Sequence, residues 1–88
     1  MTDSIKAYAY LLQCADGSLY AGWTTEPQHR LAQHNLGKGA KYTRSRLPVV
    51  LKAVWQFDSK AEAMRFEWQL KQMSRARKLE LISIHEHL

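Results

Sequence analysis

The dipeptide Asp16-Gly17 constrains the fold of this chain more than any other feature. It separates two apolar runs, Ala7 to Cys14 and Ser18 to Thr24, and both runs contain Tyr and Leu. Asp-Gly is a strong two-residue hairpin turn because both of its positions tolerate positive φ. The sequence therefore predicts an antiparallel hairpin near the N-terminus, and with it a sheet.

Helix-boundary signals outline the segment after the hairpin. Thr25 and Gln28 have the spacing of a capping box, and Pro27 suits the first turn of a helix, so Thr25 is expected to be the N-cap. Gly37 suits the left-handed position that follows the end of this helix. The residues from 38 to 48 are expected to form an ordered basic loop.

One further strand and two helices are expected in the second half of the chain. A run rich in β-branched residues from Val49 to Phe57 predicts the third strand. Ser59 and Glu62 form a second capping box, which opens a helix that ends near Met73. Ser74 is expected to cap the last helix. The inward-facing residues of that helix are predicted to be Leu79, Ile82 and Leu81.

The order strand, strand, helix, strand, helix, helix predicts the α+β class, with a three-stranded antiparallel sheet flanked by helices. A chain of 88 residues is expected to form a single domain over residues 1–88. Its one cysteine, Cys14, fits a reducing cytoplasm better than a secreted scaffold. The first apolar run is too short to span a membrane, and no signal-peptide cleavage site follows it. We therefore expect a soluble, cytoplasmic protein.

Positive charge is concentrated in the middle of the chain. The net charge is +5, and no acidic residue lies between Glu26 and Asp58. This pattern favours a polyanionic partner, with nucleic acid first and an anionic membrane surface second. A solvated basic face that keeps the protein soluble explains the charge alone equally well. The basic residues of this segment are Arg30, Lys38, Lys41, Arg44, Arg46 and Lys52, with His29 and His34.

Two places in the first half of the chain are hard to explain by the fold alone. In Tyr20-Ala21-Gly22, the glycine lies inside an apolar strand, where glycine often marks the close approach of another group. Arg30 and His34 are four residues apart and share one helix face, so Arg30 can bind a phosphate where His34 can relay a proton. A solvated polar face is the alternative for this pair.

Glu67 is a third such place, because it lies within or beside the apolar stripe of its predicted helix. Burying an unpaired carboxylate costs several kcal/mol, so Glu67 needs a cationic partner. Lys71 at i+4 and Arg30 from another element are two candidates. A divalent metal ion is the third.

These residues together resemble the GIY-YIG endonuclease superfamily. The resemblance rests on the order and spacing of the whole set rather than on any one tripeptide. Its first half comprises Tyr8-Ala9-Tyr10, Tyr20-Ala21-Gly22, Arg30 and His34. Its second half comprises Gly37-Lys38-Gly39-Ala40-Lys41-Tyr42-Thr43, Glu62-Ala63, Glu67 and Lys71.

The C-terminal part indicates a branch of that superfamily. Ser74-Arg75-Ala76-Arg77-Lys78, followed by Leu81-Ile82, is similar to the small stand-alone, YhbQ-like proteins. The nuclease module of the repair protein UvrC is a more distant relative. This likeness implies the GIY-YIG nuclease fold and a role in DNA repair or processing.

The sequence departs from the family pattern at several positions. Tyr8 and Ala9 stand where the name-giving motif has Gly and Ile, and Trp23 stands where several nuclease members have a Lys. The late Asn that many larger members carry near the metal has no clear counterpart. We also expect no second domain, from which nucleases of this family often obtain affinity and sequence choice.

The resemblance implies a metal-dependent endonuclease that hydrolyses phosphodiester bonds. Glu67 would hold one Mg²⁺ or Mn²⁺, mostly ligated by water, and Arg30 would stabilise the charge on the phosphoryl oxygens. Tyr20 would activate a water, with Tyr10 and His34 tuning or relaying the proton. The sequence leaves open which tyrosine is the base. We expect Tyr10, Tyr20, Arg30 and Glu67 to converge on one exposed concave surface.

The implied partner is nucleic acid, with DNA favoured over RNA, and no membrane. Lys38, Lys41, Arg44 and Arg46 would position the phosphate backbone without reading bases. A separate protein could supply specificity. The main alternative is a non-catalytic nucleic-acid-binding module on the same fold, and a third hypothesis is a basic face that binds an acidic partner protein.

The C-terminal pair His85 and His87 is expected to lie in a frayed or exposed tail. Two imidazoles fall short of the three or four protein ligands that are typical of a zinc site, so we do not expect a metal there.

Overall fold

The computed structural model describes residues 5–87 and confirms the α+β class. Three antiparallel strands form one sheet in the order β2-β1-β3, so β1 is central and the other two are edges. The strands are β1 (Ala7–Gln13), β2 (Leu19–Thr24) and β3 (Val50–Phe57). The helices in the described part are α1 (Pro27–Asn35), α2 (Lys41–Arg44), α3 (Lys60–Gln72) and α4 (Arg75–Glu86). The predicted order of elements is confirmed, with α2 added.

The predicted hairpin joins β1 to β2, but its turn is longer than expected. The Cys14 amide donates to the Ser18 carbonyl at 2.8 Å, and the Gly17 amide donates to the Cys14 carbonyl at 2.9 Å. Within this turn, only Gly17 takes a positive φ, of 85°. This is a three-residue loop, so the predicted two-residue turn is wrong. The carboxylate of Asp16 instead stabilises the loop by accepting the Ser18 amide at 3.0 Å.

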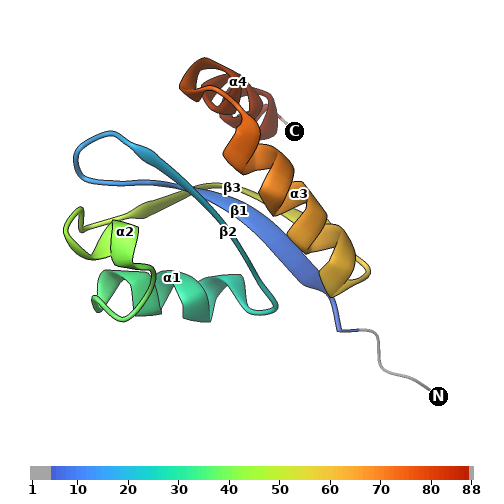
Figure 1. Cartoon of the computed structure of the whole chain (residues 1–88), viewed down its shortest axis with the longest axis horizontal. Helices are drawn as coiled ribbons and strands as arrows, with labels where there is room; N and C mark the ends of the chain where they lie inside the picture. The colour runs from blue at the N-terminus through green and yellow to red at the C-terminus, as the bar shows by residue number, and fades with distance from the viewer. Residues whose placement is uncertain (1–4, 88) are drawn as a thin grey trace.

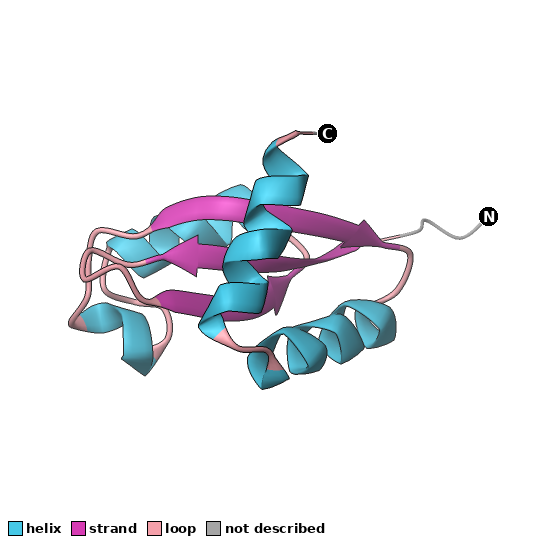
Figure 2. Cartoon of the chain, turned by 90° about the horizontal axis from the view of Figure 1, so that it is seen from above, coloured by secondary structure: helices cyan, strands magenta, loops and turns pink. Residues whose placement is uncertain are grey.

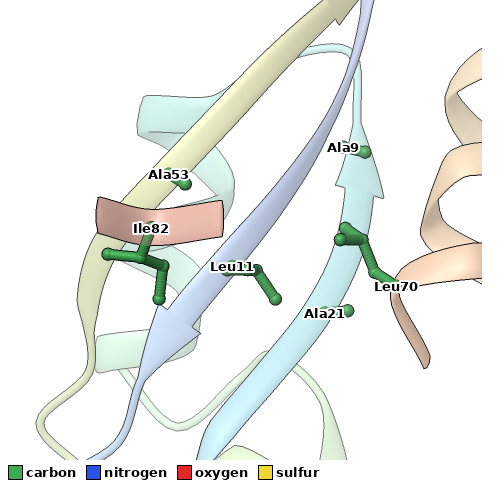
Figure 3. Packing of buried hydrophobic residues seen from close by; sticks show 6 residues of the cluster. All are labelled: Ala9, Leu11, Ala21, Ala53, Leu70 and Ile82. Atoms are coloured by element: carbon green, nitrogen blue, oxygen red, sulfur yellow. The ribbon is translucent and has the colours of Figure 1, made fainter. Parts of the chain in front are cut away.

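The helices cover both faces of the sheet. Figure 1 shows α1 and α2 beneath the sheet, with α3 and α4 on its other side. Side chains alternate along each strand, so Ala9 and Leu11 of β1 point toward α3 and α4. They belong to a buried cluster that Figure 3 shows in close-up. The members of this cluster are Ala9, Leu11, Ala21, Ala53, Leu70 and Ile82.

The opposite face of β1 packs against α1 and the segment that follows it. Tyr10, Leu12 and Cys14 are buried there, and Leu31 of α1 and Leu47 pack against them. The tyrosines of the family motif therefore project from the face that α1 covers. Asn35 at the end of α1 ties this layer to the chain before β3, because its side chain exchanges two hydrogen bonds with the backbone of Val49.

The capping predictions hold for α3 and α4 and fail for α1. Ser59 accepts the Glu62 amide at 3.2 Å, and Ser74 accepts the Arg77 amide at 3.1 Å. The N-cap of α1 is Glu26 rather than Thr25. The reason is Pro27, which takes the first helical position and so leaves the residue before it as the cap.

The end of α1 lies where the sequence predicts it. The segment from 38 to 48, predicted to be a loop, is partly helical. Gly37 follows the helix with a φ of 76°, as expected. The segment expected to be a loop contains the single turn of α2.

The last helix differs from the prediction at two residues. Leu79 is 40% exposed, so its predicted inward position is wrong, whereas Ile82 is buried and Leu81 partly buried. His85 is not in an exposed tail. Its Nε2 lies 3.0 Å from the carbonyl oxygen of Val54, and its ring lies edge-on to Trp55. His85 thus covers part of the unpaired edge of β3.

Within residues 5–87, no helix is long and apolar enough to cross a membrane.

Candidate active site

Gly22 leaves room for the ring of Tyr10 to lie across the neighbouring strand, β2. Tyr10 on β1 is the register partner of Gly22 on β2. A Cβ added at Gly22 would overlap the ring and hydroxyl of Tyr10. The close approach that the strand glycine predicted is therefore confirmed, and the approaching group is Tyr10 itself. Tyr10 is only 3% exposed.

His34 lies at the centre of the polar cluster beneath the sheet. It projects from α1 and is completely buried. Its Nε2 lies 3.0 Å from the Tyr10 hydroxyl, and its Nδ1 lies 2.9 Å from Oγ1 of Thr43. The ring is also edge-on to Tyr20, with 5.7 Å between ring centroids. A solvated polar face, the alternative considered for His34, is wrong.

The single turn of α2 contributes two residues to this cluster. Tyr42 stacks on Tyr20 with 5.9 Å between centroids and an interplanar angle of 21°, and Thr43 contacts His34. Arg46 holds Tyr42 in turn, because its guanidinium lies 3.9 Å from the ring centroid and donates to the Tyr42 carbonyl at 2.7 Å.

The four predicted phosphate-binding cations differ in their surroundings. Lys38, Lys41 and Arg44 are exposed. Arg46 donates from Nε to Asp16 at 3.1 Å and is only partly exposed. Three of the four cations are therefore presented to solvent, whereas Arg46 stabilises the fold around Tyr42.

Glu67 reaches the tyrosines from the other face of the sheet. Figure 2 shows α3 on the β2 side of the sheet. Oε2 of Glu67 lies 3.8 Å from Nζ of Lys71, and that ammonium lies 5.3 Å from the centroid of the Tyr20 ring. Tyr20 projects from the sheet face that α1 covers, whereas α3 lies on the other face. Lys71 of α3 therefore reaches Tyr20 around β2, which is an edge strand. Of the partners considered for Glu67, Lys71 is the one that pairs with it.

Burial and nearby charges set the protonation of Tyr10 and His34. Burial is the main cause that raises the pKa of Tyr10 above its usual value, whereas the neighbouring Arg30 lowers it and the charges of Tyr20 and Glu67 raise it. Burial, aided by Arg30, lowers the pKa of His34. Near neutral pH, Tyr10 therefore keeps its proton and His34 is uncharged.

A cavity of about 400 Å³ lies beside this cluster. Of the predicted site residues, Arg30 lines this cavity. The cavity is lined by Trp23, Thr24, Thr25, Glu26, His29, Arg30, Gln33 and Lys60. Its basic side chains and its one indole suit an anionic, aromatic ligand such as a nucleotide.

The residues at Glu67 fit a hard divalent cation that keeps most of its water. Within residues 5–87, no group of three or more His, Cys, Asp or Glu side chains could enclose a metal ion. Mg²⁺ is commonly held by one or two carboxylates together with water and substrate phosphates, rather than by a protein cage. The Glu67 side chain is 22% exposed and its ion pair with Lys71 is long, so the carboxylate keeps coordination capacity.

Sequence comparison places the chain among known proteins. The amino-acid sequence matches the family model described as the GIY-YIG catalytic domain over residues 6–80. The chain belongs to the GIY-YIG family. GIY-YIG domains are nuclease domains, which act on nucleic acid and typically use a divalent metal ion.

Small stand-alone GIY-YIG proteins are similar over nearly their whole length. A UPF0213 protein of Halobacterium salinarum is 55% identical over 71 residues, which cover 81% of this chain and 92% of the relative. A UPF0213 protein of Streptococcus agalactiae is 53% identical over 83 residues, with 94% of each chain covered. These relatives agree with the small, YhbQ-like branch.

Two solution NMR structures share the fold. A UPF0213 protein from Bacillus halodurans has a TM-score of 0.59 and 51% identity, and the match covers 90% of this chain and 84% of that one. A protein from E. faecalis has a TM-score of 0.63 and 38% identity, and the match covers 100% and 94% of the two chains. Both confirm the GIY-YIG fold of this chain.

Sequence reasoning missed several residues that complete the cluster. Tyr42 and Thr43 belong to the family motif at residues 37–43. The sequence assigns a role only to the basic residues of this segment, as phosphate contacts. Gly39 allows the loop to pack on His34, since a Cβ there would overlap the imidazole ring. Lys71 was expected only as an ion-pair partner, and its position over Tyr20 gave no signal in the sequence.

Proposed function

We propose that this protein is an endonuclease that hydrolyses phosphodiester bonds of DNA with one divalent metal ion, Mg²⁺ or Mn²⁺. The observation that carries this proposal is the meeting of Tyr10, Tyr20, His34 and the Glu67–Lys71 pair, which come from four elements and both faces of the sheet. Residues that serve the fold alone have no need to gather hydroxyl, imidazole and carboxylate groups in one place.

The two tyrosines have different parts in this proposal. Tyr20 is half-buried and activates the attacking water, whereas the buried Tyr10 relays the proton to His34. Burial raises the pKa of Tyr10, so its hydroxyl stays protonated at neutral pH and can accept a proton only after giving up its own. Its hydrogen bond to the uncharged His34 supplies an acceptor for the proton.

Arg30 and Glu67 act on the phosphate. Arg30 lines the cavity and stabilises the negative charge that develops on the phosphoryl oxygens. Glu67 would hold the metal ion, which would supply positive charge to offset the negative charge that builds up on the phosphate. Lys38, Lys41 and Arg44 bind the neighbouring phosphates without reading bases.

A non-catalytic nucleic-acid-binding module remains the second candidate. It is favoured by Trp23, which stands where several nuclease members have a Lys and which lines the cavity beside Arg30. An indole at this position can stack on a base but cannot neutralise a phosphate.

Nicking of supercoiled plasmid separates the two candidates. The full chain is incubated with Mg²⁺, with Mn²⁺ and with a chelator, alongside Glu67→Ala. Glu80→Ala on α4, an exposed carboxylate paired with Arg77, is the matched control. We expect metal-dependent nicking that Glu67→Ala loses and Glu80→Ala keeps. DNA binding without nicking in either metal would favour the binding module.

A further inference from the structure

Thr43 is a buried polar residue that none of the assigned roles explains. It comes from α2 and is completely buried. Its Oγ1 lies 2.9 Å from Nδ1 of His34 and 2.9 Å from the carbonyl oxygen of Ala40. Because Nε2 of His34 contacts the Tyr10 hydroxyl, one line of hydrogen bonds runs from the Ala40 carbonyl to Tyr10.

The Ala40 carbonyl fixes the direction of every hydrogen bond in this line. A carbonyl oxygen can only accept, so the Thr43 hydroxyl donates to it. The Thr43 oxygen then accepts from His34, which requires a hydrogen on Nδ1. A neutral imidazole carries one N–H, so Nε2 has a lone pair and accepts from Tyr10.

The reverse arrangement is unfavourable. If Thr43 donated to His34, its oxygen would face the Ala40 oxygen at 2.9 Å with no proton between them. Such a pair of facing acceptors loses the Thr43–Ala40 hydrogen bond and repels.

The surroundings of His34 keep its ring uncharged. Only the uncharged ring has two tautomers, with the hydrogen on either Nδ1 or Nε2. Burial lowers its pKa, and the Arg30 charge lowers it further. The backbone at Gly39 packs closely on the ring, and the ring of Tyr20 also contacts it.

We propose that Thr43 is a positioning residue of the active site, whose hydroxyl holds His34 in the Nδ1–H tautomer so that Nε2 can take the proton of Tyr10. In that step the Tyr10 O–H bond breaks and an Nε2–H bond forms, which leaves a phenolate and an imidazolium. Thr43 accepts from Nδ1–H before and after the transfer. In the other tautomer, Nε2 would already carry a hydrogen and could only donate to Tyr10.

The part of Thr43 in the reaction rests on the proposed nuclease function, but the tautomer can be measured without it. Nitrogen-15 shifts of the His34 ring are recorded on the parent protein at pH values above its pKa, without added metal. We expect a pyrrole-type shift for Nδ1 and a pyridine-type shift for Nε2. The opposite assignment in the parent would overturn the proposal even if no variant of Thr43 folds.

Variants at Thr43 separate positioning from packing. Thr43→Val keeps the shape and removes the hydroxyl, whereas Thr43→Ser keeps the hydroxyl. Ser45→Ala, which removes an exposed hydroxyl at the end of the same turn, is the matched control. We expect Thr43→Val to populate the Nε2–H tautomer and to lose about 10- to 100-fold in plasmid nicking without losing DNA affinity. Thr43→Ser and Ser45→Ala are expected to behave like the parent.

Two outcomes of this experiment distinguish the present inference from the proposed function. A folded Thr43→Val that keeps the parent tautomer and the parent rate of nicking would overturn the role of Thr43. A parent that shows the Nδ1–H tautomer but cuts no DNA would overturn the nuclease function and support the tautomer assignment.

Discussion

Single glycines determine how closely the rings of the site approach the backbone. Gly22 could be recognised in the sequence, because a glycine inside an apolar strand is unfavourable unless another group needs the space. Gly39 could not, because it lies in a segment with several turn residues and its neighbour His34 comes from a different element. The same limit applies to Thr43, whose two partners are defined only by the fold.

Gly22→Ala should be destabilising only because of Tyr10. The added Cβ overlaps the Tyr10 ring, so the ring must move and its bond to His34 lengthens. We expect a loss of about 1–3 kcal/mol in the free energy of unfolding, measured by urea denaturation. In a Tyr10→Ala background the same substitution should cost almost nothing. An equal cost in both backgrounds would show that the Tyr10 ring is not the obstacle.

His34 should make the fold less stable in mild acid. Burial lowers its pKa below the usual 6.5, so below that pH the unfolded chain binds a proton that the folded chain does not. The free energy of unfolding therefore falls as the pH drops from the unfolded pKa toward the folded one, by at most about 1.4 kcal/mol per unit. Urea midpoints of the parent and of His34→Gln are compared on both sides of the usual pKa. The parent should lose more stability, and equal losses would contradict the assignment of His34 as a buried neutral group.

At the scale of elements, α2 is the part of the fold that sequence patterns could not predict. A single helical turn has no stability of its own, because nucleation costs more than its few hydrogen bonds return. Contacts of Tyr42 with Tyr20 and of Thr43 with His34 hold it in place. The strands and longer helices were predictable because their boundary signals are local, as at Ser59 and Ser74.

The cations of the α2 segment should fall into two functional groups. Lys41→Ala and Arg44→Ala remove exposed charges, so both should weaken DNA binding similarly across sequences. The slope of log K against log salt should decrease by about 0.9 for each lost duplex-phosphate contact. Arg46→Ala should instead lower the thermal midpoint, since Arg46 bonds to Asp16 and to the Tyr42 carbonyl. An unchanged salt slope in both exposed variants would show that α2 does not contact phosphate.

At the scale of the whole molecule, the site is assembled round one edge of the sheet. Tyr10, Tyr20 and His34 belong to the layer that α1 covers, whereas Glu67 and Lys71 come from the layer on the other face. The sequence predicted helices flanking a three-stranded sheet, but it could not show that β2 is an edge strand round which Lys71 reaches Tyr20. The proposed nuclease depends on this link between the two layers.

Glu67→Gln tests that link most directly, because it keeps the shape of the side chain and removes its charge. The Glu67–Lys71 pair is long and partly exposed, so its loss should cost no more than about 1 kcal/mol in metal-free thermal unfolding. We expect DNA binding to be at least as strong, since a negative charge leaves a surface that meets phosphate, and metal-dependent nicking of plasmid to be lost. A strongly destabilised Glu67→Gln whose nicking is unchanged would show that Glu67 is part of the scaffold, and would contradict the single-metal nuclease.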